Sequence, residues 1–126
     1  MIFGIGTDLV KIARMQVLLN KHHHKIAQRI LSDAEFEQFQ TTTKKAAFLA
    51  KRFAAKEATS KAFGTGFRDG LSLRHIEVTN NTAGKPELHF TNRAQELLKQ
   101  FNISQSLISL SDDGDYAIAY VTLVNG

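Results

Sequence analysis

The run of residues 44–63, between the break at Thr41-Thr42-Thr43 and Gly64, limits the possible folds of this chain more than any other feature. Its length and composition predict one long helix, which Gly64-Thr65-Gly66 ends. Alanines recur along the run at intervals of three and four residues, which places them on one helix face. They are Ala47, Ala50, Ala54, Ala58 and Ala62. A face without bulky side chains lets a sheet pack closely, so we expect a long central helix covered by a sheet.

Shorter patterns predict the elements around this helix. Apolar runs bounded by turn residues predict strands at residues 1–8, 71–79, 85–90, 103–111 and 116–124, the last two joined by a turn at 112–115. Helical spacing predicts helices at 9–20, 26–31 and 91–101, and another that begins at Ser32, where Glu35 completes a capping-box spacing. Strands and helices come in blocks, which is typical of an α+β fold with an antiparallel sheet. We expect one domain over residues 1–126.

Composition narrows the class of protein. Hydrophobic residues make up 43% and charged residues 22% of the chain, which is typical of a soluble globular domain. No apolar run approaches the roughly 20 residues of a membrane span, so we expect no membrane association. The absence of cysteine excludes disulfides and thiol catalysis, and the N-terminal run lacks the basic region of a signal peptide. We therefore expect a cytoplasmic protein.

The net charge of +4 favours an anionic partner. Nucleotides, nucleic acid and an acidic protein are all partners of this kind, and charge alone does not choose among them. A nucleic-acid-binding domain would combine clustered basic residues with exposed aromatic ones. Most of the nine phenylalanines fall at core spacing and tryptophan is absent, so we expect no nucleic-acid partner.

Two carboxylates and a lysine form the strongest candidate site. Asp8 follows the first apolar run, in which Gly4 and Gly6 allow close packing of the backbone. Glu57 and Lys61 lie four residues apart, on one helix face. Carboxylates are suitable ligands for a divalent cation that holds a phosphorylated substrate. A lysine ammonium group can offset the negative charge that develops during phosphate transfer. Two structural alternatives remain open: Asp8 as a helix N-cap, and a surface ion pair between Glu57 and Lys61.

The same residues carry a resemblance to a known family. Gly6-Thr7-Asp8 and Phe53-Ala-Ala-Lys-Glu-Ala-Thr-Ser-Lys-Ala62 together resemble the signature of the 4′-phosphopantetheinyl transferases, in particular the small bacterial single-domain holo-acyl-carrier-protein synthases. Further similarity lies in residues 29–31, 64–66, 84–86, 109–112 and 116–119. The resemblance implies an antiparallel sheet packed on a long central helix. It also implies magnesium-dependent transfer of 4′-phosphopantetheine from coenzyme A to a serine of apo-acyl carrier protein, in fatty acid biosynthesis.

The resemblance implies roles for individual residues. Asp8 and Glu57 would be magnesium ligands, and Lys61 would offset charge on the leaving phosphate. The planar guanidinium of Arg52 suits a terminal nucleotide phosphate, and Lys56, which points away from Glu57, suits a contact with phosphate or solvent. The other residues expected around coenzyme A are Lys44, Gly64, Gly66, Lys85 and Pro86.

A basic segment near the N-terminus is the expected docking surface for the protein substrate. Its members are Lys11, Arg14 and Arg29, with Arg14 as the main candidate. The resemblance implies an acidic acyl carrier protein as partner, and a homotrimer whose interfaces complete the site. His22, His23 and His24 are adjacent, so their side chains diverge and we expect a solvated run rather than a metal site. At Asp112 many members of the family have histidine, so no role is assigned to it.

A protein that kept this fold without its chemistry is a further alternative. Such a protein would be expected to lack one of the carboxylates or the lysine. Asp8, Glu57 and Lys61 are all present, so the sequence favours an enzyme.

Overall fold

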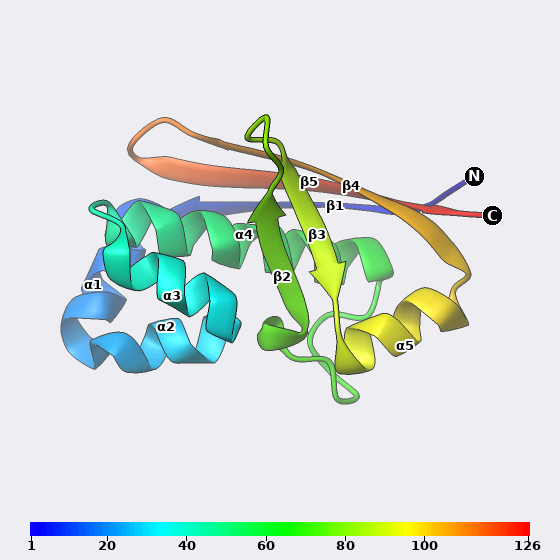
Figure 1. Cartoon of the computed structure of the whole chain (residues 1–126), viewed down its shortest axis with the longest axis horizontal. Coiled ribbons are helices and arrows are strands. Elements are labelled where there is room, and N and C mark those ends of the chain that lie inside the picture. Colours follow the sequence, from blue (N-terminus) through cyan, green and yellow to red (C-terminus); the bar gives the residue numbers. More distant parts are fainter.

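Helix α4 (Lys45–Phe63) is the central element of the computed structural model, which describes residues 1–126. The strands are β1 (Ile2–Lys11), β2 (Ile76–Asn80), β3 (Pro86–Phe90), β4 (Ile103–Asp112) and β5 (Tyr116–Asn125). A three-stranded antiparallel sheet in the order β1-β5-β4 packs along α4, and the antiparallel hairpin β2-β3 crosses in front of the helix (Figure 1). The predicted α+β fold is confirmed, with two antiparallel sheets rather than one.

The remaining helices lie around the two ends of α4. Around its N-terminal half are α1 (Ile12–His22), α2 (His24–Ile30) and α3 (Asp33–Thr41). A short 3-10 turn, η1 (Leu73–His75), leads into β2, and α5 (Asn92–Gln100) lies at the opposite end, near both chain termini (Figure 1). No helix combines the length and the apolar character that crossing a membrane requires.

The sheet packs on α4 through its smallest residues, as the alanine stripe predicted. A Cβ atom on Gly4 would collide with the carbonyl oxygen of Ala62, and one on Gly6 would collide with that of Ala58. From β5, Ala117 packs in the same fully buried layer. Glycine at these positions therefore brings the backbone of β1 directly onto the backbone of α4, which fixes every later residue of β1 relative to the helix.

The boundary between β1 and α1 differs from the prediction. The helix expected to begin at Leu9 begins at Ile12, because β1 stays paired with β5 as far as Lys11, opposite Tyr116. Leu9 is exposed and Val10 is buried, as the alternation of a strand requires. Asp8 therefore lies within a strand, and the alternative of Asp8 as a helix N-cap is wrong. The strand expected from residue 71 likewise begins later, at Ile76, after η1.

The start of α3 follows the prediction in detail. The Ser32 hydroxyl accepts a hydrogen bond from the Glu35 amide, and the Glu35 carboxylate accepts one from the Ser32 amide, which completes a capping box. Phe39 is buried and packs against the ring of Phe48 on α4. These contacts fix α3 against the N-terminal half of α4.

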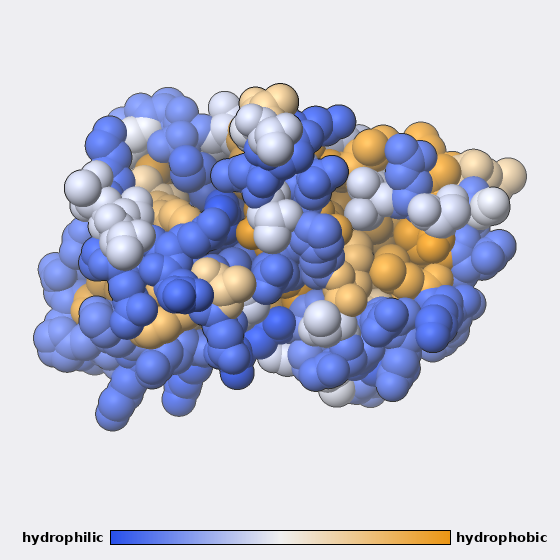
Figure 2. Space-filling model, in the orientation of Figure 1, coloured by the Kyte–Doolittle hydropathy of each residue, from blue (hydrophilic) through white to orange (hydrophobic).

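The surface has two apolar regions of different kind. One apolar region is seen on the right of Figure 2, between β3 and the chain ends, whereas hydrophilic residues cover most of the left side, over α1 and α2. The other apolar region is the outer face of the three-stranded sheet, which is turned away from α4. Among its exposed apolar members are Ile5, Leu9, Leu107, Ile118 and Tyr120, which are 42–61% exposed and alternate with inward-facing residues along their strands. We call these five residues the outer sheet face.

Candidate active site

Asp8 projects from β1 towards α4. Side chains alternate along a strand, so Asp8 shares the inner face of β1 with Gly6 and Val10. Because the backbone of β1 rests on α4 at Gly6, the carboxylate two residues later is held beside the helix. The Asp8 side chain is 17% exposed, which leaves one edge accessible to solvent or a ligand.

Lys61 of α4 contacts β1 and not its own helix. Its Nζ lies 3.2 Å from Asp8 Oδ1 and donates a hydrogen bond of 2.9 Å to the carbonyl oxygen of Thr7. The ion pair between Lys61 and Glu57, which the sequence left open, is not formed. The Lys61 side chain is 54% exposed, so its ammonium group remains accessible.

Glu57 lies at the border of the alanine stripe and is partly buried, as expected. Burial raises the pKa of Glu57, the negative charge of Asp8 raises it further, and Lys61 opposes both effects. The two carboxylates therefore lie close enough to interact electrostatically. We refer to Asp8, Glu57 and Lys61 together as the carboxylate–lysine site.

The carboxylate–lysine site has ligand chemistry suited to magnesium. Mg²⁺ in phosphate-transferring sites is usually held by one or two carboxylates, and waters and substrate phosphates complete its octahedron. Asp8 and Glu57 supply two carboxylates whose mutual repulsion a cation would offset. Nowhere in the chain do three or more His, Asp or Glu side chains gather as a metal-binding group. The site therefore fits a cation that shares its coordination with a substrate.

Lys56 requires a correction. Its neighbour in sequence, Glu57, is only partly buried, whereas Lys56 is completely buried. Its Nζ lies 2.6 Å from Glu35 Oε1 and donates a hydrogen bond of 2.7 Å to the carbonyl oxygen of Ile30. A contact with phosphate or solvent is therefore unavailable to this side chain. Lys56 connects α4 to the chain around α3.

Arg52 is also buried, but it is only partly paired. Its Nε lies 3.7 Å from Glu35 Oε2 and has no hydrogen-bond partner. The guanidinium lies over the ring of Phe48, 4.5 Å from its centroid. Burial lowers the pKa of Arg52 and of Lys56, and the carboxylate of Glu35 opposes this effect on both.

Glu35 is the residue that sequence reasoning assigned only to the capping box. Besides its bonds to Ser32 and Lys56, Glu35 Oε2 accepts a hydrogen bond of 2.8 Å from the amide of Val78 in β2. One buried carboxylate thus joins α3, α4 and β2. No local pattern marks this role, because Glu35 and Lys56 lie 21 residues apart in sequence.

The other residues expected around coenzyme A are spread along the molecule. Lys44 is exposed just before α4, and Gly64 follows the helix, so the 19 residues of α4 separate them by about 28 Å. Gly64 and Gly66 have φ angles of 80° and 64°, which favour glycine. Lys85 and Pro86 line a cleft of about 260 Å³ between β3 and β4. Gly64 donates a hydrogen bond to the carbonyl oxygen of Lys61 and so lies beside the carboxylate–lysine site, whereas Lys44 lies at the other end of α4.

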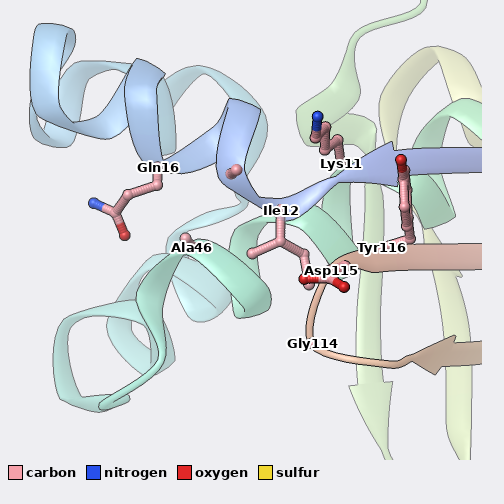
Figure 3. A pocket seen from close by; sticks show the side chains of 8 residues that line it. Lys11, Ile12, Gln16, Ala46, Gly114, Asp115 and Tyr116 are labelled. Atoms are coloured by element: carbon pink, nitrogen blue, oxygen red, sulfur yellow. The ribbon is translucent and has the colours of Figure 1, made fainter.

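The expected docking residues lie at the same end of the molecule as α1 and α2. Arg14 and Arg29 are exposed on these helices, whereas Lys11 is the last residue of β1 and not part of a helix. Lys11 borders a hollow of about 370 Å³ at the junction of β1 with α1 (Figure 3). Figure 3 shows that Gln16 of α1, Ala46 of α4 and Asp115 of the β4–β5 turn also face this hollow.

The histidine run and Asp112 have separate surroundings. His22 ends α1, His24 begins α2, and His23 between them has a positive φ of 52°. All three are exposed, as expected for a surface run. Asp112 lies 3.7 Å from Lys51 of α4, so a surface ion pair engages it.

Comparisons with known proteins converge on one family. A family model described as the 4′-phosphopantetheinyl transferase superfamily matches residues 4–121. A holo-[acyl-carrier-protein] synthase of Halorhodospira halophila is 48% identical over the whole of both chains, and one of Nitrosococcus oceani is 48% identical over 98% of this chain and 80% of its own. The crystal structure of the synthase from Neisseria meningitidis has a TM-score of 0.94 at 40% identity, covering 99% of this chain and all of that one. The synthase from Bacillus anthracis, in complex with CoA (3′,5′-ADP), has a TM-score of 0.83 at 34% identity, covering 100% and 99%.

Proposed function

The chain belongs to the 4′-phosphopantetheinyl transferase superfamily, and we propose that it transfers 4′-phosphopantetheine from coenzyme A to a serine of apo-acyl carrier protein. The observation that carries this proposal is the carboxylate–lysine site, which combines Asp8 of β1 with Glu57 and Lys61 of α4. Coenzyme A as the donor is supported by related synthases solved with it bound. The resemblance to the family supports a role in cytoplasmic fatty acid biosynthesis.

Asp8 and Glu57 would hold a magnesium ion. When bound, this ion supplies a contact to the pyrophosphate oxygens and offsets their charge. The two carboxylates come from rigid elements, a strand and a helix in backbone contact, so their separation is fixed before the substrate arrives.

The transfer itself is an in-line displacement at the β-phosphorus of coenzyme A. The serine oxygen bonds to this phosphorus as the bond to the departing oxygen of adenosine 3′,5′-bisphosphate breaks. The serine proton passes to a carboxylate or to water, and Glu57 is the proposed acceptor, directly or through a water. Lys61 offsets the charge that grows on the leaving oxygen.

Arg52 is the main proposed phosphate contact of this chain. A buried guanidinium whose Nε lacks a hydrogen-bond partner is suited to a phosphate, which accepts in the plane of the guanidinium. The further proposed contacts with coenzyme A are Lys44, Gly64, Gly66, Lys85 and Pro86. Lys56 is no longer among them, because it is buried against Glu35.

We further propose a homotrimer that buries the outer sheet face. Contiguous exposed apolar side chains of this kind mark interaction surfaces. The dispersal of the proposed coenzyme A contacts along one chain supports a site completed by a second copy. Leu9→Glu and Ile118→Glu should each convert the assembly to monomers in light scattering coupled to size-exclusion chromatography. A wild-type chain that is monomeric at micromolar concentration would contradict the trimer.

Docking of the acyl carrier protein is proposed at Lys11, Arg14 and Arg29. Their side chains are exposed at the end of the molecule formed by α1 and α2. An acidic partner would be attracted by these charges before contact, which speeds association and makes it sensitive to salt.

Intact-mass spectrometry tests the proposed reaction directly. Apo-acyl carrier protein is incubated with this protein, coenzyme A and magnesium, and the expected result is a mass increase by one phosphopantetheine. The increase should vanish with a chelator of divalent cations. No increase with a carrier that other transferases modify would contradict the proposed function. The alternative of a fold without chemistry predicts this second result.

A further inference from the structure

Three charged side chains are buried together where α3, α4 and β2 meet. The side chains of Glu35, Lys56 and Arg52 are 1%, 0% and 6% exposed. Among these three side chains one carboxylate faces two cations, and the carboxylate of Glu77, which accepts a hydrogen bond from Ser32, acts on Lys56 from the edge of the group. Buried charge is costly unless it is paired and hydrogen-bonded, so the distribution of contacts within this group is informative.

Both carboxylate oxygens of Glu35 accept hydrogen bonds from partners other than Arg52. Its Oε1 accepts from Lys56 Nζ at 2.6 Å and from the Ser32 amide at 2.9 Å. Its Oε2 accepts from the Val78 amide at 2.8 Å. Lys56 is likewise satisfied, since it also donates to the carbonyl oxygen of Ile30.

Arg52 is the member of the group that has no hydrogen bond to a carboxylate. Its Nε is 3.7 Å from Glu35, beyond hydrogen-bond distance, and has no other partner. Its guanidinium is held in orientation by Phe48. Buried donors in folded proteins are almost always satisfied, so the partner of Arg52 Nε is expected to come from outside the chain, as a water or as an acceptor oxygen of a ligand.

We infer that Lys56 is a positioning residue which, by engaging Glu35, leaves the Arg52 guanidinium available for a phosphate of the bound ligand. The inference rests on the proposed function, in which this phosphate is the 3′-phosphate of coenzyme A. Without Lys56, Glu35 would be the only carboxylate beside Arg52, and a movement of less than about 1 Å would convert the present separation into a hydrogen-bonded ion pair. The guanidinium would then be neutralised before the ligand binds.

The test compares two ligands that differ only in this phosphate. Dissociation constants for coenzyme A and for 3′-dephospho-coenzyme A are measured by calorimetry with the wild type, Lys56→Met, and the double variant Glu35→Gln with Lys56→Met. In the wild type we expect coenzyme A to bind about tenfold or more tightly than the dephospho form. In Lys56→Met the dissociation constants of the two ligands should differ by no more than about twofold. In the double variant, which has neither the lysine nor the carboxylate, the ratio should return to the wild-type value.

This recovery distinguishes positioning from a structural role. If Lys56 served only to stabilise the fold, removing Glu35 as well would not restore discrimination between the ligands. Lys45→Met is the matched control, because Lys45 also lies on α4 and donates to carbonyl oxygens but does not contact Glu35. Its ratio should equal that of the wild type.

Several results would overturn the inference. They are an unchanged ratio in Lys56→Met, a reduced ratio in the double variant, and a wild-type ratio near one. Should Lys56→Met not fold, the double variant decides: a wild-type ratio supports the inference, and a lower one overturns it. Failure of the proposed function is a different result, in which the wild type neither binds coenzyme A nor modifies the carrier.

Discussion

Two clusters that helix α4 shares with its neighbours are built from carboxylates and basic side chains in opposite proportions. The carboxylate–lysine site at the surface has two carboxylates and one cation, and its Lys61 is half exposed. The cluster of Glu35, Lys56 and Arg52 has one carboxylate and two cations, and it is buried. The outer cluster is thus suited to a cation and the inner one to an anion, although Lys56 and Glu57 are adjacent in sequence.

The comparison teaches that the helix face, and not the residue type, decides the role of each lysine. Lys61 extends across to β1 and keeps its ammonium accessible, because the glycines of β1 bring that strand close to α4. Lys56 points to the opposite side of the stripe, where α3 and β2 enclose it. A mutation in the carboxylate–lysine site should therefore lower activity more than stability, and a mutation in the buried cluster should lower stability.

The largest effect is expected at Glu57. Glu57→Gln keeps the shape of the side chain but removes a proposed metal ligand, so transfer should fall by about 1,000-fold or more. The free energy of unfolding should change by less than about 1 kcal/mol, because Glu57 has no ion-pair or side-chain hydrogen-bond partner in the chain. The rate of carrier modification and urea unfolding measure the two quantities. A variant that keeps full activity would remove Glu57 from the mechanism.

The buried cluster should show the reverse pattern. Lys56→Met leaves the Glu35 carboxylate without its closest cation, and we expect a loss of about 3–5 kcal/mol in the free energy of unfolding. Combining it with Glu35→Gln removes both charges, so the double variant should lose less than Lys56→Met alone. Urea unfolding of the three proteins measures these differences. Equal losses in both variants would show that the charge of Glu35 is not the source of the cost.

The same contrast explains what the sequence could reveal. The alanine stripe of α4, the capping box at Ser32 and the β4–β5 turn are local patterns, and all three were predicted correctly. The segment around Leu9 was misassigned because adjacent apolar residues suit either helix or strand, and pairing with β5 decides between them. The joining of Glu35 to Lys56 and Val78 depends on three elements meeting in space, which no spacing along the chain encodes.

A smaller effect is expected at Arg14. Arg14→Glu reverses a charge on the exposed side of α1. We expect the KM for acyl carrier protein to rise about tenfold at low salt, with the affinity for coenzyme A unchanged. Raising the ionic strength should reduce the difference between variant and wild type, because salt screens exposed charges. Unchanged kinetics with the carrier would rule out Arg14 as a docking residue.

The smallest effect concerns the pH dependence of stability in the absence of metal. The pKa of Glu57 in the folded protein is raised above its ordinary value of 4.5 by burial, with Asp8 adding to the shift. Between these two pKa values the folded state binds more protons than the unfolded state, so this group stabilises the fold at low pH. Its contribution is lost as the pH rises through the folded-state pKa.

Glu57→Gln does not titrate and should lack this loss. Relative to the wild type, the variant should therefore become slightly more stable as the pH rises from about 4.5, and the difference should level off above the folded-state pKa of Glu57. Urea unfolding across this range, with a chelator present, measures the difference. Magnesium favours the ionised carboxylate, so adding it to the wild type should release protons below that pKa and none in the variant. A difference that does not vary with pH would mean that Asp8 and Glu57 do not share the electrostatic environment of a metal site.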